Sequence, residues 1–271
     1  MSDVLLDWWD GHEVAALRQT WSVPTLEAYR RIGSTNDRAR ELASEGGSVW
    51  STVVADEQTR GRGRRGTTWI SEPGAGLWMS VLLDGGLPPT TVPLEVGLAC
   101  AEAMEEVVEG IEVGIKWPND LLLDGAKVGG ILCEAAGRRI VAGIGINVAG
   151  APDPSVVAKA DGLPPLPLQV ASGKSLLRSR LADLVVQRLR SRFGDTLVDR
   201  QGLDAATLEE LQRRDVLLGE VIETEQAGVG RAAGIDASGA LRLVTSDRTE
   251  LRIVSGSVRR VSGGVPDIGR A

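Results

Sequence analysis

The sequence predicts an α+β protein with a larger mixed domain followed by a small β domain. In residues 1–214, apolar runs typical of strands alternate with segments of helical periodicity. From residue 215 the pattern changes to short alternating segments separated by turns, which is typical of a small β-barrel. We therefore predict two domains, 1–214 and 215–271.

The elements of the larger domain follow from periodicity and from turn residues. Strands are expected at 25–31, 49–56, 77–83, 127–134 and 139–148. Asp124-Gly125 is a hairpin signal between two apolar runs. Helices are expected at 11–20, 38–43, 91–109, 172–193 and 204–213. A proline-rich loop is expected at 150–170.

The helix expected at 172–193 has the strongest amphipathic pattern in the chain. Its arginines lie opposite the apolar stripe, and we expect that basic face to be solvated. The stripe consists of Leu177, Leu181, Leu184, Val185 and Leu189. In the β domain, strands are expected at 216–224, 230–235, 241–245, 251–254 and 258–261, with a turn at 236–239.

Composition is that of a globular protein, with 42% hydrophobic and 25% charged residues and a net charge of −7. An acidic chain argues against a broad nucleic-acid-binding face. Two cysteines and one histidine cannot form a metal cluster at their spacing, and cysteines inside apolar runs suggest a reduced, cytoplasmic protein. No apolar run approaches the ~20 residues that span a bilayer, and the N-terminus lacks the basic region of a signal peptide.

A glycine- and arginine-rich loop follows the strand expected at 49–56. Residues 60–66 hold four arginines and three glycines. Glycines allow close approach of the backbone to a ligand, and arginine forks match phosphate oxygens. We expect the loop to be mobile when empty, because its charges repel and no side chain packs there. It is a phosphate clamp or, alternatively, a basic surface loop that binds nucleic acid loosely or binds nothing.

Polar residues gather at two other breaks in the pattern, and glycines interrupt two of the expected strands. Residues 34–36 (Ser-Thr-Asn) either cap a helix or hydrogen-bond a small polar head group. Residues 116–120 (Lys-Trp-Pro-Asn-Asp) display polar side chains where proline interrupts a strand. The glycines at 129–130, 143 and 145 leave strand faces bare, so another group can pack against the backbone. Trp69 is either a core residue or a lid that stacks on a flat ligand.

Five motifs, in order and with their spacing, resemble those of biotin protein ligases (biotin–[acetyl-CoA-carboxylase] ligases). They are Gly33–Asn36, Gly61–Gly66, Lys116–Asp120, Lys127–Glu134 and Gly145–Asn147. The resemblance implies a class II synthetase-like mixed sheet with helices on one face, and a C-terminal SH3-like β-barrel. It also implies ATP- and magnesium-dependent formation of biotinyl-5′-AMP, followed by transfer of biotin to one lysine of a biotin carboxyl carrier protein.

The resemblance also implies roles for individual residues. Biotin binding falls to Ser34, Thr35, Asn36, Gln58, Arg62, Gly63, Arg64, Lys127, Gly129 and Gly130. Nucleotide binding falls to Arg62, Arg64, Arg65, Trp69, Asn119, Lys127 and Asn147. Catalysis falls to Lys127, Arg62, Arg64 and Asp120.

Repulsion between two negatively charged substrates explains why this set of residues includes cations. Two unit charges about 4 Å apart repel by roughly 4 kcal/mol at an effective dielectric near 20, and Lys127, Arg62, Arg64 and magnesium would offset that repulsion between carboxylate and triphosphate. Asp120 could ligate magnesium or accept a proton from the acceptor lysine, and the sequence does not decide. No covalent enzyme intermediate is needed.

Two positions depart from the family pattern, and one segment is short. Arg60 stands where many members carry a small residue. A basic residue near the chain end is either Arg259 or Arg260. Only 32 residues precede Gly33, fewer than an N-terminal winged-helix domain needs. We therefore expect a monofunctional ligase without sequence-specific DNA binding, as a monomer or homodimer, acting on acetyl-CoA carboxylase or another biotin-dependent carboxylase.

Three alternatives remain open from the sequence. Lipoate and octanoate ligases share the catalytic fold, although the arginine loop and residues 116–120 favour biotin. A nucleic-acid-binding protein could use the same loop on phosphates, and it would show steep salt dependence. A degenerate ligase could act only as a biotin-binding module, but the intact Lys127 and Arg64 argue against this.

Overall fold

The structure is a computed structural model that describes residues 4–86, 88–157, 163–194 and 202–261. Parts of the loop expected at 150–170 and of the domain expected at 215–271, namely residues 158–162 and 262–271, lie outside the described residues.

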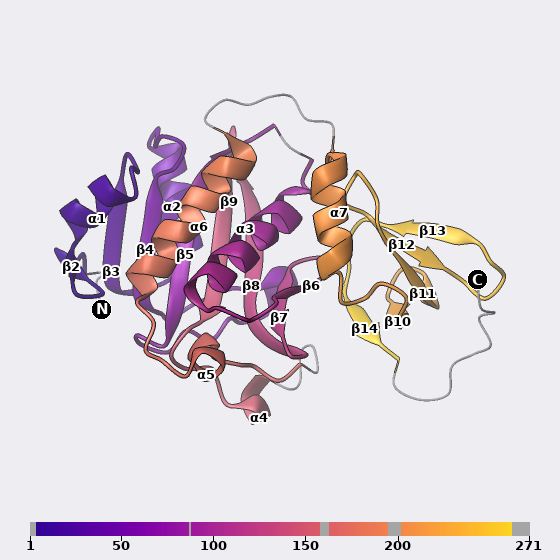
Figure 1. The fold of residues 1–271 in the computed structure, drawn as a ribbon. Coiled ribbons are helices and arrows are strands. Elements are labelled where there is room, and N and C mark those ends of the chain that lie inside the picture. Colours follow the sequence, from indigo (N-terminus) through magenta and orange to yellow (C-terminus); the bar gives the residue numbers. More distant parts are fainter. Residues whose placement is uncertain (1–3, 87, 158–162, 195–201, 262–271) are drawn as a thin grey trace.

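A seven-stranded sheet forms the centre of the larger domain (Figure 1). Strands β3 and β4 are parallel and the other neighbouring pairs are antiparallel, so the sheet is mixed, as predicted. The spatial order is β3 (Leu26–Ile32), β4 (Thr52–Gln58), β5 (Gly76–Asp84), β9 (Arg139–Asn147), β8 (Ala126–Ala136), β7 (Asp120–Leu123) and β6 (Gly114–Lys116). Asp124 and Gly125, with φ of 51° and 77°, form the predicted turn between β7 and β8.

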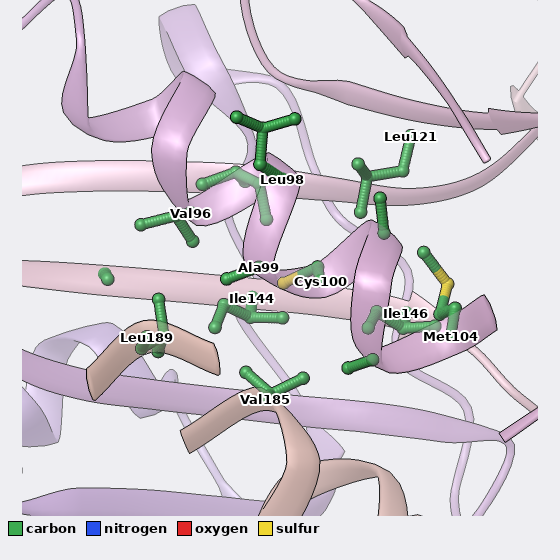
Figure 2. Close-up of a cluster of buried hydrophobic side chains, with 14 of the residues drawn as sticks. Val96, Leu98, Ala99, Cys100, Met104, Leu121, Ile144, Ile146, Val185 and Leu189 are labelled. Carbon is green, nitrogen blue, oxygen red and sulfur yellow. The ribbon is translucent and has the colours of Figure 1, made fainter. Parts of the chain in front are cut away.

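Helices cover both faces of this sheet, which corrects the expectation of helices on one face. Helices α3 (Val92–Val107) and α6 (Arg178–Phe193) pack together on one face, in the main core shown in Figure 2. Helix α2 (Thr35–Ser44) packs on the other face. The reason lies in strand alternation: Val54 points into the main core, whereas its neighbours Val53 and Ala55 point towards α2. A strand buried on both faces needs cover on both faces.

Helix α6 is shorter than the predicted helix 172–193. Ser172 ends a separate helix, α5 (Leu168–Ser172), because Gly173 adopts the left-handed conformation (φ 62°) that terminates it. Leu177 lies at the N-cap of α6 and is exposed, while the other four members of the predicted stripe are buried.

The expectation of a solvated arginine face on α6 is wrong at two positions. Arg178 contacts Asp10 and Asp56, and Arg192 contacts Glu102 and Glu210. Both arginine side chains are only 12% exposed.

The other helices and strands outside the small β domain are short. They are β1 (Trp8–Trp9), β2 (His12–Glu13), α1 (Val14–Thr20), the 3₁₀ turn η1 (Arg64–Gly66), α4 (Pro154–Val157) and α7 (Ala205–Arg214). The stretch predicted as loop at 150–170 therefore contains α4 and the start of α5. Helix α7 confirms the prediction for 204–213, with the Asp204 side chain accepting from the Thr207 amide at 2.8 Å.

A five-stranded antiparallel sheet confirms the small β domain. Its order is β13 (Glu250–Ile253), β12 (Leu241–Val244), β11 (Gly228–Ile235), β10 (Val221–Thr224) and β14 (Val258–Arg260). It joins the larger domain near β6, where the Val216 amide donates to the Ile115 carbonyl and the Trp117 indole donates to the Gly239 carbonyl. The domain boundary at 214/215 falls between α7 and β10 and stays a prediction.

Within the described ranges, no helix combines the length and apolar character that crossing a membrane requires.

Candidate functional site

A pocket of about 910 Å³ opens on the sheet face that carries α2. Helix α2 packs over β4, β5 and β9, and the pocket continues that face over β8 and β9. Gly130, Gly143 and Gly145 line it. Most of the predicted site residues also line it: Ser34, Thr35, Asn36, Gln58, Arg62, Gly63, Arg64, Arg65, Trp69, Asn119, Asp120, Lys127 and Asn147.

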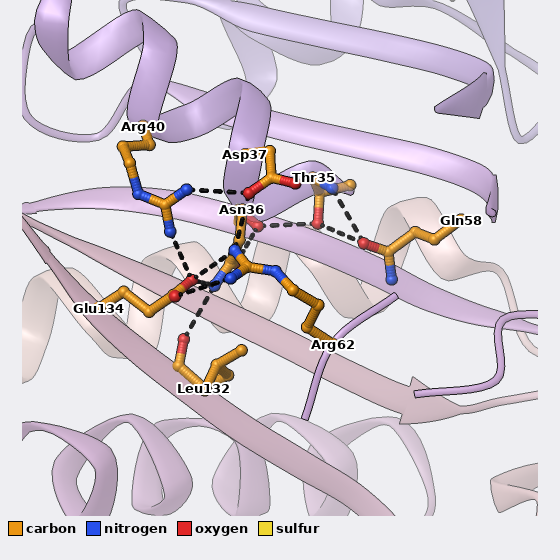
Figure 3. Close-up of polar contacts among 9 residues, drawn as sticks. Thr35, Asn36, Asp37, Arg40, Gln58, Arg62, Leu132 and Glu134 are labelled. Carbon is orange, nitrogen blue, oxygen red and sulfur yellow. Dashed lines mark hydrogen bonds and ion pairs between the residues drawn. The ribbon is translucent and has the colours of Figure 1, made fainter. Parts of the chain in front are cut away.

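One end of the pocket is a hydrogen-bonded polar group at the start of α2. The Gln58 Oε1 accepts from the Thr35 amide at 2.9 Å and lies 3.1 Å from the Thr35 hydroxyl. Ser80 links to the Thr35 hydroxyl at 2.8 Å and donates to Asn36 Oδ1 at 2.7 Å (Figure 3 shows Thr35, Asn36 and Gln58). Ser34 occupies the N-cap position but makes no side-chain capping bond within the described chain. These buried groups suit a small polar head group better than a simple cap.

Gly143 is what allows Asn36 to reach the sheet. A Cβ at residue 143 would lie 2.2 Å from Asn36 Oδ1, so the Asn36 side chain would have to leave its place. The polar end therefore depends on a bare position in β9, as the glycine pattern predicted.

The other end of the pocket carries cations and amides. Lys127 Nζ lies 2.7 Å from Asp120 Oδ1, and both side chains are largely buried. Arg64 Nη1 donates to Asn119 Oδ1 at 3.3 Å. The Asn147 amide donates to the Lys127 carbonyl at 3.3 Å, and its Oδ1 is buried with no hydrogen-bond partner among the described residues. A buried carbonyl oxygen without a donor is a ready acceptor for a ligand hydroxyl or amine.

The glycine- and arginine-rich loop folds as a hairpin over the pocket. The Trp69 amide donates to the Gly61 carbonyl, and the Gly63 amide donates to the Thr67 carbonyl. The turn at its tip uses Arg65 at a φ of 56°, in the left-handed region. The side chains of Arg62 and Arg65 make ion pairs with other parts of the fold, so the expectation that no side chain packs on this loop is wrong, whereas its mobility stays a prediction.

Trp69 lies inside the pocket, on the bare faces of β8 and β9. A Cβ at Gly145 would lie 2.6 Å from the Trp69 ring, and one at Gly130 would lie 3.1 Å from it. Lys127 Nζ sits 5.6 Å from the ring centroid. The indole Nε1 is buried without a hydrogen-bond partner in the described chain. The indole of the core residue Trp9 likewise lacks a hydrogen-bond partner in the described chain, so both roles of Trp69 stay predictions.

The arginines of the hairpin have partners in other parts of the fold. Arg62 contacts Asp37 and Glu134 (Figure 3). Arg65 contacts Glu225 of the β domain at 2.6 Å, and this arginine lowers the pKa of the Glu225 carboxyl. The mutual repulsion expected among the arginines is thus offset by acidic residues far away in sequence.

The other positions singled out from the sequence are Gly129, Arg60, Arg259 and Arg260. Gly129 lies outside the pocket lining, because a Cβ there would face the Gly145 carbonyl and the core residue Leu121. Arg60 packs over Gly33, also outside the lining. Of the two C-terminal candidates, Arg259 lines the pocket, whereas Arg260 donates to the Val216 carbonyl.

The sequence interpretation missed several pocket neighbours. Glu134 was quoted in a motif but given no role, although strand alternation puts it on the same face of β8 as Gly130. Asp37, Arg40 and Ser80 had no local signal beyond their helix and strand positions. Glu225 and Ser257 come from the β domain, and nothing in the local pattern joins them to this pocket.

No group of three or more histidine, cysteine, aspartate or glutamate side chains in the described ranges could hold a metal ion. Asp120 is the carboxylate predicted for this purpose, and it is paired with Lys127. The site thus offers an anion-binding pocket with polar and cationic ends, under a hairpin and beside a β domain, on an α+β fold.

These features define a domain built to hold an organic acid next to a phosphate-bearing ligand. The chain belongs to the biotin protein ligase family. The profile of the biotin/lipoate A/B protein ligase family matches residues 28–150, and that of the biotin protein ligase C terminal domain matches residues 216–260.

Individual relatives agree with this membership. The biotin–[acetyl-CoA-carboxylase] ligase of Paracoccus denitrificans is 36% identical over 225 residues, which are 79% of this chain and 91% of that protein. The structure of the biotin protein ligase from Aquifex aeolicus in complex with biotin and ATP matches with a TM-score of 0.73 and 29% identity, covering 88% of this chain and 100% of that one.

A third relative is matched over a shorter region. The bifunctional ligase/repressor BirA of Bacillus spizizenii is 42% identical over 124 residues, which are 43% of this chain. The match spans only 38% of the length of that relative.

Proposed function

We propose that this protein activates biotin with ATP to biotinyl-5′-AMP and then transfers biotin to a lysine of a biotin carboxyl carrier protein. The observation that carries the proposal is one pocket with a hydrogen-bonding end at Thr35, Asn36 and Gln58 and a cationic end at Lys127 and Arg64. Family membership adds support, because the Aquifex aeolicus relative is described in complex with biotin and ATP.

In this proposal the ureido head of biotin binds at the start of α2. Thr35, Gln58 and Asn36 supply donors and acceptors, with Ser80 bonded to Thr35 and Asn36, and Gln58 bonded to Thr35. The ring system lies against the bare strand positions at Gly130 and Gly145 once the Trp69 ring, which covers them in this structure, has moved aside. Ser34 and Gly63 line the same region. Specificity for biotin over lipoate then comes from buried polar groups that lipoate would leave unpaired.

The activation step needs positive charge at the other end. A carboxylate oxygen of biotin attacks the α-phosphorus of ATP, and the bond to pyrophosphate breaks. Lys127 offsets the charge that builds on the phosphorus, and Asp120 holds its ammonium group in place. Arg64, Arg65, Asn119 and Asn147 bind the nucleotide, and Arg259 adds a cation from the β domain.

In the transfer step, the neutral ε-amine of the acceptor lysine attacks the acyl carbon and AMP leaves. Asp120 lines the same pocket, but its pairing with Lys127 favours a role in positioning, and the amine proton then leaves with the phosphate of AMP. Trp69 covers the adenine when the hairpin closes over the adenylate.

Magnesium enters this reaction as the counter-ion of ATP. Magnesium in proteins usually binds through one or two carboxylates together with substrate phosphates. One pocket carboxylate, Asp120, fits such an arrangement, and the described residues contain no group of three or more histidine, cysteine, aspartate or glutamate side chains that could hold the ion. When bound, the ion neutralises phosphate charge.

The decisive test is isotope exchange between pyrophosphate and ATP, with biotin, lipoate, octanoate or no acid added. Exchange with biotin alone would support biotin activation. Exchange with lipoate or octanoate would instead move the chain towards the lipoate ligases of the same broad family. No exchange with any acid, in folded protein with magnesium, would leave a biotin-binding module.

A further inference from the structure

Four charged side chains form a closed cluster beside the pocket, where the hairpin, α2 and β8 meet (Figure 3). Arg62 Nη2 lies 2.8 Å from Asp37 Oδ1 and 3.0 Å from Glu134 Oε2. Arg40 lies 2.9 Å from each of the same two carboxylates. Arg62 belongs to the hairpin, and the other three belong to the sheet and to α2. The cluster therefore ties the hairpin to the body of the domain.

The formal charges in this cluster cancel. Two guanidinium groups face two carboxylates, so Arg62 contributes little net positive potential to the pocket. Moving Arg62 onto a phosphate would leave two carboxylates sharing only Arg40. Arg64, which also lines the pocket, contacts Asn119 and the Gly256 carbonyl.

The hairpin links Arg62 directly to Trp69. Arg62 pairs across the hairpin with Thr68, the residue before Trp69. The Trp69 ring in turn covers Gly145 on the pocket floor. Contacts that fix Arg62 in position therefore also fix the Trp69 ring over the pocket floor.

We propose that Asp37 and Glu134 are positioning residues, which grip Arg62 and thereby keep the hairpin and Trp69 closed over the pocket. Arg62 acts through the hairpin and stays with its two carboxylates during the reaction. The identity of the enclosed ligand, an acyl-adenylate, rests on the proposed function, but the grip itself does not.

The rate of cleavage by trypsin reports how often the hairpin opens in the ligand-free protein. Arg60, Arg62, Arg64 and Arg65 are four potential cleavage sites, and cleavage of a locally opened segment reports how often it opens. In the ligand-free protein, Glu134→Gln should raise the rate of cleavage within residues 60–66 about fivefold, which corresponds to about 1 kcal/mol. Glutamine keeps an oxygen for the Asn36 amide, which now donates to Glu134 at 2.8 Å. Asp37→Asn, at a partly exposed position, should act in the same direction.

Arg40→Gln is the matched control. It removes a charge from the same cluster but leaves Arg62 with both carboxylates, so the hairpin should be cleaved at the wild-type rate. An equal rise in the cleavage rate of Arg40→Gln would show that hairpin opening depends on the total charge of the cluster and not on the contacts of Arg62, and it would overturn the proposal. An unchanged rate in both Glu134→Gln and Asp37→Asn would also overturn the proposal.

A second measurement follows the ligand. Biotinyl-AMP, formed in place and then chased with unlabelled substrate, should leave Glu134→Gln several times faster than it leaves Arg40→Gln. Equal release rates would contradict the positioning role. If wild-type protein forms no adenylate, the proposed function is wrong. The trypsin comparison still tests whether Asp37 and Glu134 hold Arg62 in place.

Discussion

Asp215 gives this protein a pH-dependent stability that a single substitution should remove. It lies between α7 and the β domain, and it is 9% exposed. Its Oδ1 accepts from the Leu217 amide at 2.9 Å, and its Oδ2 has no hydrogen-bond partner in the described part of the chain. Burial raises the pKa of Asp215 from 3.8 to about 6, against the opposing effect of backbone amides at Leu217 and Leu218.

The sign and size of the effect follow from this shift. The folded protein binds the proton more tightly than the unfolded chain, so protonation of Asp215 stabilises the fold. That contribution is fully present below about pH 4 and is lost as the pH rises through about 6. A shift of about two pKa units corresponds to about 3 kcal/mol of unfolding free energy.

Asp215→Asn removes the charge and keeps the shape. Measured by urea unfolding, the variant should be more stable than wild type at pH 7.5 by up to about 3 kcal/mol, and the two should converge at pH 4. The control Asp247→Asn removes an exposed carboxylate whose pKa is lowered by hydrogen bonds from Thr245 and Thr249, so it should bring no gain at pH 7.5. A difference between Asp215→Asn and wild type that does not change with pH would refute the reasoning.

Three further predictions concern the pocket. Lys127→Ala should nearly abolish biotin-dependent pyrophosphate exchange, because the charge on the phosphorus is no longer offset, and a wild-type rate would contradict its role. Arg64→Gly should release biotinyl-AMP, seen as indiscriminate labelling of lysines by mass spectrometry; retention equal to wild type would count against Arg64 as a nucleotide-binding residue. Gly145→Ala places a Cβ 2.6 Å from the Trp69 ring, so tryptophan fluorescence should change, and an unaltered spectrum would show that the ring does not rest there.

Local patterns predicted the parts of the fold that depend on neighbours in sequence. The Asp124-Gly125 turn was foreseeable because two adjacent residues carry the required positive φ values. The glycines of β9 predicted a bare strand face because a residue without a Cβ leaves its position on the sheet open. The boundary of α6 was missed because an unbroken apolar spacing concealed the stop at Gly173.

Pairings between distant residues could not be predicted in this way. Arg62 meets Glu134, 72 positions away, and Arg65 meets Glu225, 160 positions away. Neither pairing leaves a trace in local periodicity. The arginines could therefore be recognised as an anion-binding set, but the acidic residues that restrain them became visible only in three dimensions.

Under the proposed function, the bare floor of the pocket has two competing occupants. Gly145 and Gly130 leave space for a flat ligand, and in this structure the Trp69 ring covers that space. A ligand that lies on these strands must first displace the ring, and the hairpin that carries it is held at Arg62 and Arg65. The measured affinity is then the intrinsic affinity reduced by the fraction of molecules already open. The same contacts that slow entry also slow escape once the hairpin closes again, which suits an enzyme that must keep a reactive adenylate until its acceptor lysine arrives.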